Sequence, residues 1–148
     1  MTLEFPNPLP VSYESTDQPS TADLAAVDEG LEHHNHAAAP LGDVRQLAAL
    51  ARDSEGRLVG GAVGRTWGRC CELLQLWVDP GCRDRGIGSR LLDTFEAHAR
   101  TRGCSIFYLI TLSFQAPEFY RAKGYRALAE IDGYPEGIVK YLMHKQDS

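Results

Sequence analysis

An apolar segment joined to an amphipathic helix through a turn rich in glycine and arginine constrains this chain more than any other feature. The run is LWVDPGCRDRGIGSRLL, residues 76–92. Gly86 and Gly88 have no Cβ atom, so their backbone can approach an anion closely. The N–H groups at the start of the helix have no partner within the helix and would point at that anion. The junction therefore predicts a strand, an anion-binding turn and a helix in succession.

Positive charge gathers at the same turn. Arg83, Arg85 and Arg90 lie in or beside it, whereas Asp84 interrupts the series and is expected to point to solvent. A glycine-containing turn by itself would serve a nucleotide, a dinucleotide or no ligand. The convergence of three arginines and two glycines on one helix start favours a phosphate group.

Length, charge and hydropathy limit the classes of protein. The 148 residues are enough for one domain, residues 1–148, with a real core. The net charge of -5 argues against nucleic-acid binding, which depends on clustered Lys and Arg. No apolar run is long enough to cross a membrane, and residues 1–10 lack the features of a signal peptide. We therefore expect a soluble cytoplasmic protein that binds neither nucleic acid nor membrane.

The cysteines are spaced unlike metal ligands. Cys70, Cys71, Cys82 and Cys104 form no Cys-x-x-Cys pair. Adjacent residues of a strand point to opposite faces, which separates Cys70 from Cys71. We expect buried, reduced thiols and no metal.

Turn signals and hydrophobic periodicity divide the chain into elements. A short edge strand at 9–13 precedes a helix that is capped by Ser20 and runs to about His36. Three antiparallel strands follow at 47–51, 58–66 and 70–78. The helix after the turn has an apolar stripe, Ile87, Leu91, Leu92, Phe95 and Ala99, with Arg90, Asp93, Glu96 and Arg100 expected to face away. A buried strand at 104–112, parallel to the strand before the helix, a short helix at 117–123 and two strands at 125–129 and 138–143 complete the pattern.

The order of these elements, together with two motifs, resembles the GNAT superfamily of acetyl-CoA-dependent N-acetyltransferases. One motif is Arg83-x-x-Gly86-x-Gly88, between a strand and the central helix; the other is APEFYRAKGY, residues 116–125, which is similar to the family's Phe-Tyr-x-x-x-Gly-Phe/Tyr segment. Within the superfamily, residues 111–117 and Tyr134-Pro135 resemble a group of small bacterial acetyltransferases. The resemblance implies an α/β (α+β) fold with a single GNAT-like domain. Its central, mixed, mostly antiparallel twisted sheet would have about seven strands, with helices on both faces.

The resemblance also implies an activity, the transfer of acetyl from acetyl-CoA to an amine of a small molecule. Direct attack in a ternary complex is expected, because no cysteine has an evident histidine base beside it. Homodimers are common in the family. A noncatalytic acyl-CoA-binding module and the acetylation of a protein or peptide amine are the alternatives. A nucleotide triphosphate enzyme is disfavoured, because no Gly-x-x-x-x-Gly-Lys-Ser/Thr run is present.

The resemblance assigns the coenzyme to the strand and the turn. The pyrophosphate would lie on the backbone of residues 83–89, and the pantetheine arm would pair with a strand edge freed by a β-bulge. The N–H of Val78 would polarise the thioester carbonyl. A fully paired core strand is the alternative. The expected coenzyme contacts are Leu76, Trp77, Val78, Arg83, Asp84, Arg85, Gly86, Ile87, Gly88, Ser89 and Arg90.

Two residues are expected to be catalytic. Tyr120 matches the family tyrosine that donates a proton to the departing thiolate, which suits a phenol with a pKa near ~10. An ammonium must lose a proton before it attacks, and Glu72 has a spacing from Arg83 like that of the glutamate that some members use as base. The alternatives are a core aromatic residue and a solvated carboxylate, respectively.

The acceptor site is expected near the end of the first helix, where the family builds it. His34, Asn35 and Glu72 are the expected contacts to the amine. His33 and His36 share a helix face but lack further metal ligands, so no metal is expected. Glu130, Asp132 and Glu136 would either add negative charge to the rim or be merely solvated. The acceptor stays open among antibiotics, polyamines, amino acids and protein amino termini.

Overall fold

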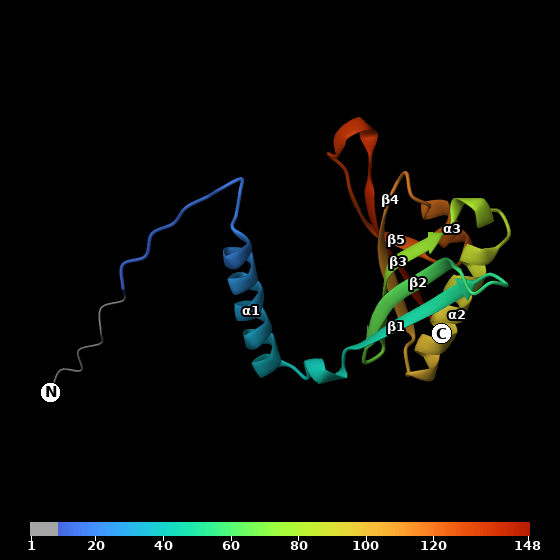
Figure 1. Cartoon of the computed structure of the whole chain (residues 1–148), viewed down its shortest axis with the longest axis horizontal. Helices are drawn as coiled ribbons and strands as arrows, with labels where there is room; N and C mark the ends of the chain where they lie inside the picture. The colour runs from blue at the N-terminus through green and yellow to red at the C-terminus, as the bar shows by residue number, and fades with distance from the viewer. Residues whose placement is uncertain (1–8) are drawn as a thin grey trace. The chain divides into compact units, whose positions relative to one another are not determined.

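The computed structural model describes residues 9–148, which form two compact units divided between Ala39 and Pro40. Residues 1–8 lie outside the described residues. They belong to the segment in which we expect no signal peptide. The first unit contains α1 (Thr21–Ala38; Figure 1), and the Oγ of Ser20 accepts from the N–H of Asp23 at 3.0 Å, as the sequence predicts. The prediction of an edge strand at 9–13 is wrong, because these residues form no strand. Pro10 has no N–H to donate to a sheet, which weakens any pairing of this segment. The expectation of one domain stays a prediction.

The second unit, residues 40–148, is built on a mixed sheet with the strand order β1-β2-β3-β4-β6-β5 (Figure 1). It has six strands rather than about seven, because the segment at 9–13 is not among them. The antiparallel pairing of β1, β2 and β3 and the parallel pairing of β3 with β4 confirm the predicted topology. The strands are β1 (Arg45–Arg52), β2 (Leu58–Trp67), β3 (Cys70–Val78), β4 (Ile106–Leu112), β5 (Arg126–Ile131) and β6 (Lys140–Gln146). The helices of this unit are α2 (Ile87–Thr101) and α3 (Pro117–Ala122), with single turns η1 (Leu41–Asp43), η2 (Pro80–Cys82) and η3 (Pro135–Gly137).

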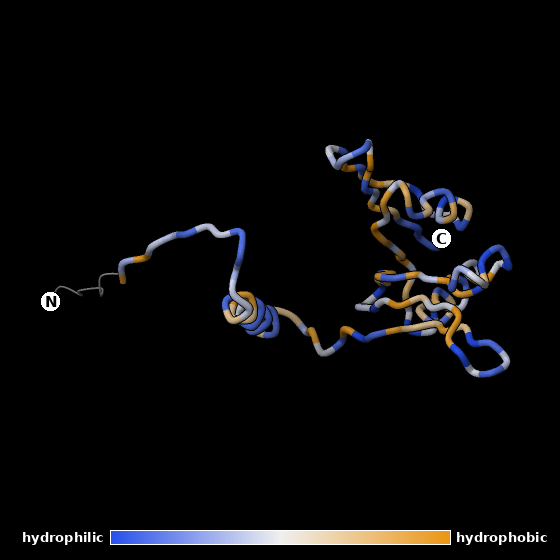
Figure 2. The backbone as a smooth tube through the Cα atoms, turned by 45° about the horizontal axis from the view of Figure 1, so that its top comes forward, coloured by the Kyte–Doolittle hydropathy of each residue, from blue (hydrophilic) through white to orange (hydrophobic). Residues whose placement is uncertain are grey.

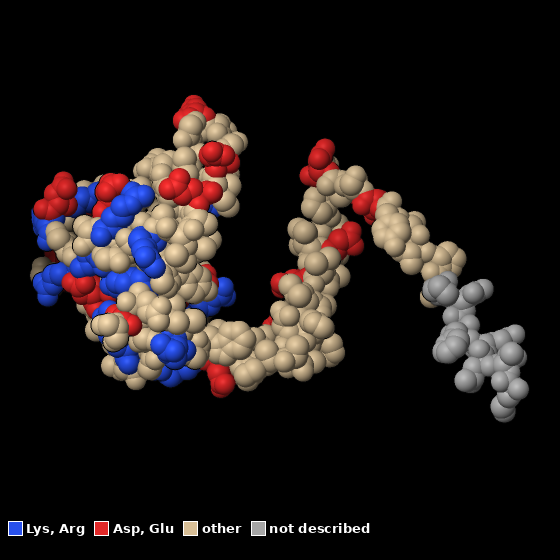
Figure 3. All heavy atoms as spheres, turned by 180° about the vertical axis from the view of Figure 1, so that it is seen from behind, with Lys and Arg blue, Asp and Glu red and all other residues tan. Residues whose placement is uncertain are grey.

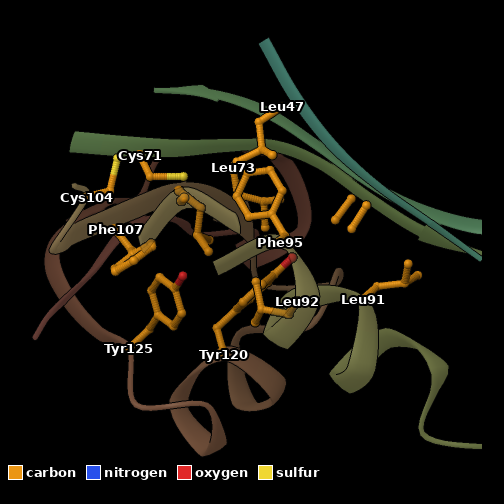
Figure 4. Packing of buried hydrophobic residues seen from close by; sticks show 14 of the residues in the cluster. Leu47, Cys71, Leu73, Leu91, Leu92, Phe95, Cys104, Phe107, Tyr120 and Tyr125 are labelled. Carbon is orange, nitrogen blue, oxygen red and sulfur yellow. The ribbon is translucent and has the colours of Figure 1, made fainter. Parts of the chain in front are cut away.

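One face of the sheet carries the hydrophobic core. Side chains of α2 and α3, among them Leu92, Phe95 and Tyr120, pack against the strands (Figure 4). Hydrophobic residues gather in the strands, whereas the connections are more hydrophilic (Figure 2). Within residues 40–148 no helix covers the opposite face, so the expectation of helices on both faces is met here on one face only. No helix of residues 9–148 is long and apolar enough to span a membrane.

The prediction that Glu96 of α2 faces solvent is wrong, because this residue is only 2% exposed. It accepts hydrogen bonds from Tyr125 Oη at 2.7 Å and from Lys145 Nζ at 2.5 Å, and Arg100 Nη2 lies 3.4 Å away. Burial, together with the charge of Glu96, raises the pKa of Tyr125 far above its ordinary value. A charged residue on a helix is buried only with such partners, and they come from distant parts of the chain. On the face of this unit that Figure 3 shows, acidic and basic side chains lie close to one another.

The cysteines only partly follow the prediction. All four are free, and Cys71 and Cys104 are buried, but Cys70 is exposed. Cys70 and Cys71 do lie on opposite faces of β3, as expected, and only one of these faces is covered by α2. Burial raises the pKa of the Cys71 thiol to about 12.

A β-bulge interrupts β3 in its middle. Val63 of β2 pairs with Gln75 and Gly64 pairs with Leu73, so Leu74 is an extra residue in β3. At Gly64 a Cβ atom would lie 2.0 Å from the carbonyl oxygen of Glu72 and 2.8 Å from Cζ of Phe95. The close approach of the two strands at this point therefore requires glycine. A bulge bends its strand and increases the local twist, which turns the rest of β3 away from β4.

Replacing Gly64 should test this constraint. We expect Gly64→Ala to lower the free energy of unfolding by about 3 kcal/mol, because the backbone of β3 must move to admit the methyl group. Urea unfolding followed by circular dichroism measures the loss. Gly61→Ala, also in β2, is the matched control, because its Cβ would meet first the mobile end of Leu50 at 3.3 Å. Its cost should stay below about 1 kcal/mol, and equal losses in the two variants would contradict the argument.

Candidate active site

The site is built where β3 parts from β4. The two strands pair only over Cys70–Leu73 and Ile106–Leu109, whereas β4 continues to Leu112 along β6. At the end of β3 the N–H of Asp79 donates to the carbonyl of Val59 at 2.8 Å, toward β2. Because N–H groups alternate along a strand, those of Leu76 and Val78 point the other way, toward the gap. The second half of β3 therefore presents a free backbone edge.

The β4 side of the gap is closed by the chain itself. Ser113 N–H donates to the carbonyl of Val139 at 2.8 Å, on the β6 side, so the N–H of Leu112 faces the gap. The Oε1 of Gln115 accepts from Leu112 N–H at 2.8 Å and lies 3.3 Å from Oγ1 of Thr111. The open donors of the gap are thus on β3.

The start of α2 lies beside this free edge. Its N-cap, Gly86, has a φ of 72°, a left-handed conformation that favours glycine, and no side chain caps the helix. The first helical bond runs from Arg90 N–H to the carbonyl of Gly86 at 3.1 Å, which leaves the N–H groups of residues 87–89 without a partner in the helix. The turn therefore offers several backbone donors and the positive end of a helix dipole to an anion.

A cavity of about 590 Å³ adjoins this turn. It brings together the residues expected to bind the coenzyme except Arg85, which is exposed, and Arg90, which lines a separate cavity beside β1. Asp84 is exposed, as expected, and also lines this cavity. Three of its lining residues were missed by the sequence reasoning about the coenzyme: Cys82, Ala116 and Phe119. Ala116 and Phe119 lie in the APEFYRAKGY motif, so this motif could have indicated that they belong to the coenzyme site.

A second cavity of about 620 Å³ continues along β3. It shares Leu76, Trp77, Ala116 and Phe119 with the first cavity, so the two follow the same strand edge. Its other lining residues are mostly apolar and include no acidic or basic side chain: Leu50, Leu58, Gly61, Val63, Leu74, Gln75, Ile110, Thr111, Gln115 and Tyr120.

Tyr120 belongs both to the core and to the wall of the second cavity. Its ring packs edge-on against Phe119 at 5.1 Å and Tyr125 at 5.9 Å between ring centroids. Burial raises the pKa of the Tyr120 phenol above its ordinary value, so the hydroxyl keeps its proton near neutral pH. A protonated phenol that reaches a cavity wall can act as a proton donor.

Glu72 lies on the sheet face opposite α2, next to the bulge. Tyr108 Oη donates to its Oε2 at 2.6 Å, and Arg65 Nη2 lies 3.4 Å from both carboxylate oxygens. Burial, followed by the hydrogen bond with Glu72, raises the pKa of Tyr108 to about 12. Glu72 does not line either cavity, but Leu74, two residues further on, lines the larger one.

The remaining expected residues are not brought to this site within the second unit. His34 and Asn35 lie in α1, in the first unit, and their contact with an acceptor stays a prediction. In α1, His36 Nε2 lies 3.6 Å from Glu32 Oε1. Across the part of the chain that the structure describes, no three His, Cys, Asp or Glu side chains cluster as metal ligands do. Glu130, Asp132 and Glu136 are exposed around the connection from β5 to β6.

Comparisons with known proteins agree with this geometry. Residues 12–125 match the acetyltransferase (GNAT) family. Blasticidin-S acetyltransferase from Streptomyces morookaense is 41% identical over 111 residues, 72% of this chain and 82% of the relative. Thialysine N-epsilon-acetyltransferase from Sus scrofa is 36% identical over 72 residues, 47% of this chain and 42% of the relative. The crystal structure of an acetyltransferase from Bacillus cereus superposes with a TM-score of 0.75 at 26% identity, covering 90% of this chain and 98% of that one.

The family match spans most of the sequence, and it includes the turn, the free strand edge and the segment that carries Tyr120. The chain therefore belongs to the GNAT family, and it is an acetyl-CoA-dependent N-acetyltransferase.

Proposed function

We propose that the chain acetylates an amine of a small molecule by direct attack on acetyl-CoA in a ternary complex. The observation that carries this proposal is the free edge of β3, which runs from the start of α2 to the cavity lined by Tyr120. Cys82 lines only the cavity at the turn, away from Tyr120, which speaks against a cysteine that carries the acetyl group. We therefore propose that the acetyl group passes in a single step from the thioester to the amine, with no acetylated cysteine.

The turn and the strand suit the two polar parts of the coenzyme. The uncapped N–H groups of residues 87–89 would bind the pyrophosphate, with Arg83 beside them. The N–H groups of Leu76 and Val78 would pair with pantetheine amides, as an added strand would. When bound, acetyl-CoA supplies an activated acetyl thioester. The chain's own part is to orient that thioester and to stabilise the charge that develops on it.

Leu76 is a better oxyanion donor than Val78, which the sequence favoured. Leu76 lines both cavities, whereas Val78 lines only the one at the turn. The carbonyl of Val78 also accepts from Arg83 Nε at 3.3 Å, which supports a role for Val78 nearer the proposed pyrophosphate site than the thioester. The N–H of Leu76 and the phenol of Tyr120 meet at the same cavity, where the thioester would have both an oxyanion donor and a proton donor. Glu72 would take the proton of the acceptor ammonium.

Blasticidin S is the acceptor that we propose. The similarity to blasticidin-S acetyltransferase, at 41% identity, covers 72% of this chain and 82% of that relative, whereas the similarity to thialysine N-epsilon-acetyltransferase from Sus scrofa, at 36% identity, covers 47% and 42%. The larger cavity also has no carboxylate in its lining, and Trp77 presents a half-exposed indole there. Such a wall suits an acceptor with an apolar or planar portion better than a flexible aliphatic diamine.

Compartment, source and assembly are further proposals. The free cysteines fit a reducing compartment such as the bacterial cytoplasm. We propose a homodimer only because homodimers are common in the family.

Arg83 and Arg90 provide a test of the coenzyme site. At about 100 times Kd, acetyl-CoA should stabilise the wild type by about 2.7 kcal/mol, and a tenfold loss of affinity would leave about 1.4 kcal/mol. We expect Arg83→Ala to halve the thermal stabilisation in this way, because it removes a cation from the cavity at the turn. Arg90→Ala is the matched control and should leave the stabilisation unchanged, since Arg90 lines another cavity. Equal effects of the two variants would contradict the placement.

Tyr120→Phe should lower kcat about 100-fold, because it removes the proton donor while keeping the ring. The raised pKa of Tyr120 means that the phenol stays protonated below about pH 10 and loses its proton only above. The ratio of wild-type to variant kcat should therefore be constant from about pH 7 to pH 10. Thiol release measured across this range tests the prediction. A ratio that falls toward one below pH 9 would rule the role out.

The acceptor is tested by competing amines. We expect kcat/KM for blasticidin S to exceed that for thialysine at least about tenfold, the size of discrimination that apolar contacts provide. Coenzyme A release in steady state measures both values. Ile110→Lys puts a cation in the larger cavity and should raise KM for blasticidin S, with stabilisation by acetyl-CoA unchanged. A preference for thialysine would refute the proposed acceptor.

A further inference from the structure

Polar side chains form a row across the sheet face opposite α2. In the strand register, Arg65 of β2 is opposite Glu72 of β3, Glu72 is opposite Tyr108 of β4, and Tyr108 is opposite His144 of β6. The adjacent residues of the three inner strands, Leu73, Leu109 and Met143, are buried in the core. Because side chains alternate along a strand, the polar row points away from that core.

The two contacts of Glu72 within this row are unequal. Tyr108 Oη is 2.6 Å from Oε2, a short bond of the kind that a hydroxyl makes with a carboxylate. Arg65 Nη2 is 3.4 Å from both oxygens, and its side chain is 53% exposed. One oxygen of Glu72 is thus fixed by the phenol, while Oε1 keeps only a long, solvent-exposed contact.

The row lies directly before the place where β3 and β4 separate. On the same face, the next residues along these strands are Leu74 and Ile110, and both line the larger cavity. A side chain at Glu72 therefore stands beside the cavity in which the acceptor would bind. Its direction matters, because a carboxylate that swings freely would spend little time within reach of the amine.

We propose that Tyr108 is the positioning residue of Glu72: it holds Oε2 and so leaves Oε1 to receive the proton of the acceptor ammonium. This inference rests on the proposed function. In the step, an N–H bond of the ammonium breaks, its electron pair stays on nitrogen, and the proton passes to Oε1 directly or through one water. Tyr108 keeps its own proton, since its pKa is raised to about 12, and remains a donor throughout.

A double-mutant cycle tests this role. The variants are Tyr108→Phe, Glu72→Gln and the two combined, with blasticidin S and acetyl-CoA as substrates. We expect Tyr108→Phe to lower kcat about tenfold with KM for acetyl-CoA within twofold, and to have no further effect in the Glu72→Gln background. Tyr141→Phe is the matched control, because it removes a phenol hydroxyl from β6 on the opposite, core-facing side of the sheet, and it should leave kcat unchanged.

The outcomes separate the inference from the function on which it rests. If the wild type turns over but Tyr108→Phe keeps kcat within twofold, or if the two single losses multiply in the double variant, the positioning role is overturned and the acetyltransferase activity stands. If the wild type acetylates no amine tested, the proposed function fails, and the catalytic role of Tyr108 fails with it. The melting temperatures of the same variants then show whether the contact exists, because coupled residues give a double loss smaller than the sum of the single losses.

Discussion

The absence of a side chain at Gly64 is the constraint on which the site depends. Only there can β2 approach the carbonyl of Glu72 closely enough for Leu74 to be left out of the pairing. The bulge then bends β3 away from β4, and no other strand of residues 40–148 takes the vacated place. The bond from Asp79 N–H to Val59 keeps the other edge of β3 on β2, so the freed donors stay directed at the gap. The proposed coenzyme site thus depends on a steric property of the neighbouring strand, β2.

The walls of the gap are held by partly buried polar contacts that link distant parts of the chain. Glu96 of α2 binds Lys145 of β6, and Lys145 Nζ also donates to the carbonyl of Lys123, directly after α3, at 3.1 Å. Lys123 Nζ in turn lies 2.9 Å from Oγ of Ser89 in the first turn of α2. These contacts fix the helix that carries Tyr120 against the turn that would bind the pyrophosphate. The proposed proton donor and the proposed anion site, which would act on one coenzyme, are thereby kept at a constant separation.

Features with a local signal in the sequence could be predicted, whereas features that depend on a partner distant in the sequence could not. The Gly86 turn, the apolar stripe of α2, the antiparallel pairing of β1 to β3 and the parallel pairing of β3 with β4 follow from spacing and turn residues, and all are found. Glu96 was expected in solvent because its partners Tyr125 and Lys145 are 29 and 49 residues away. The position of the bulge depends on what Gly64 meets in the next strand, which no pattern within β3 reveals. Which arginine lines the cavity also depends on the path of the turn, and Arg90 points elsewhere.

If the acceptor binds in the larger cavity, as we propose, the apolar lining of that cavity changes what the enzyme must supply. An ammonium that enters a cavity without carboxylates loses hydration and gains no paired charge, so its neutral form becomes favoured there. Burial in the cavity would then drive part of the deprotonation of the ammonium that precedes attack. A carboxylate such as Glu72 need only accept the proton from beside the cavity, and it can remain hydrogen-bonded to Tyr108 and close to Arg65 while it does so.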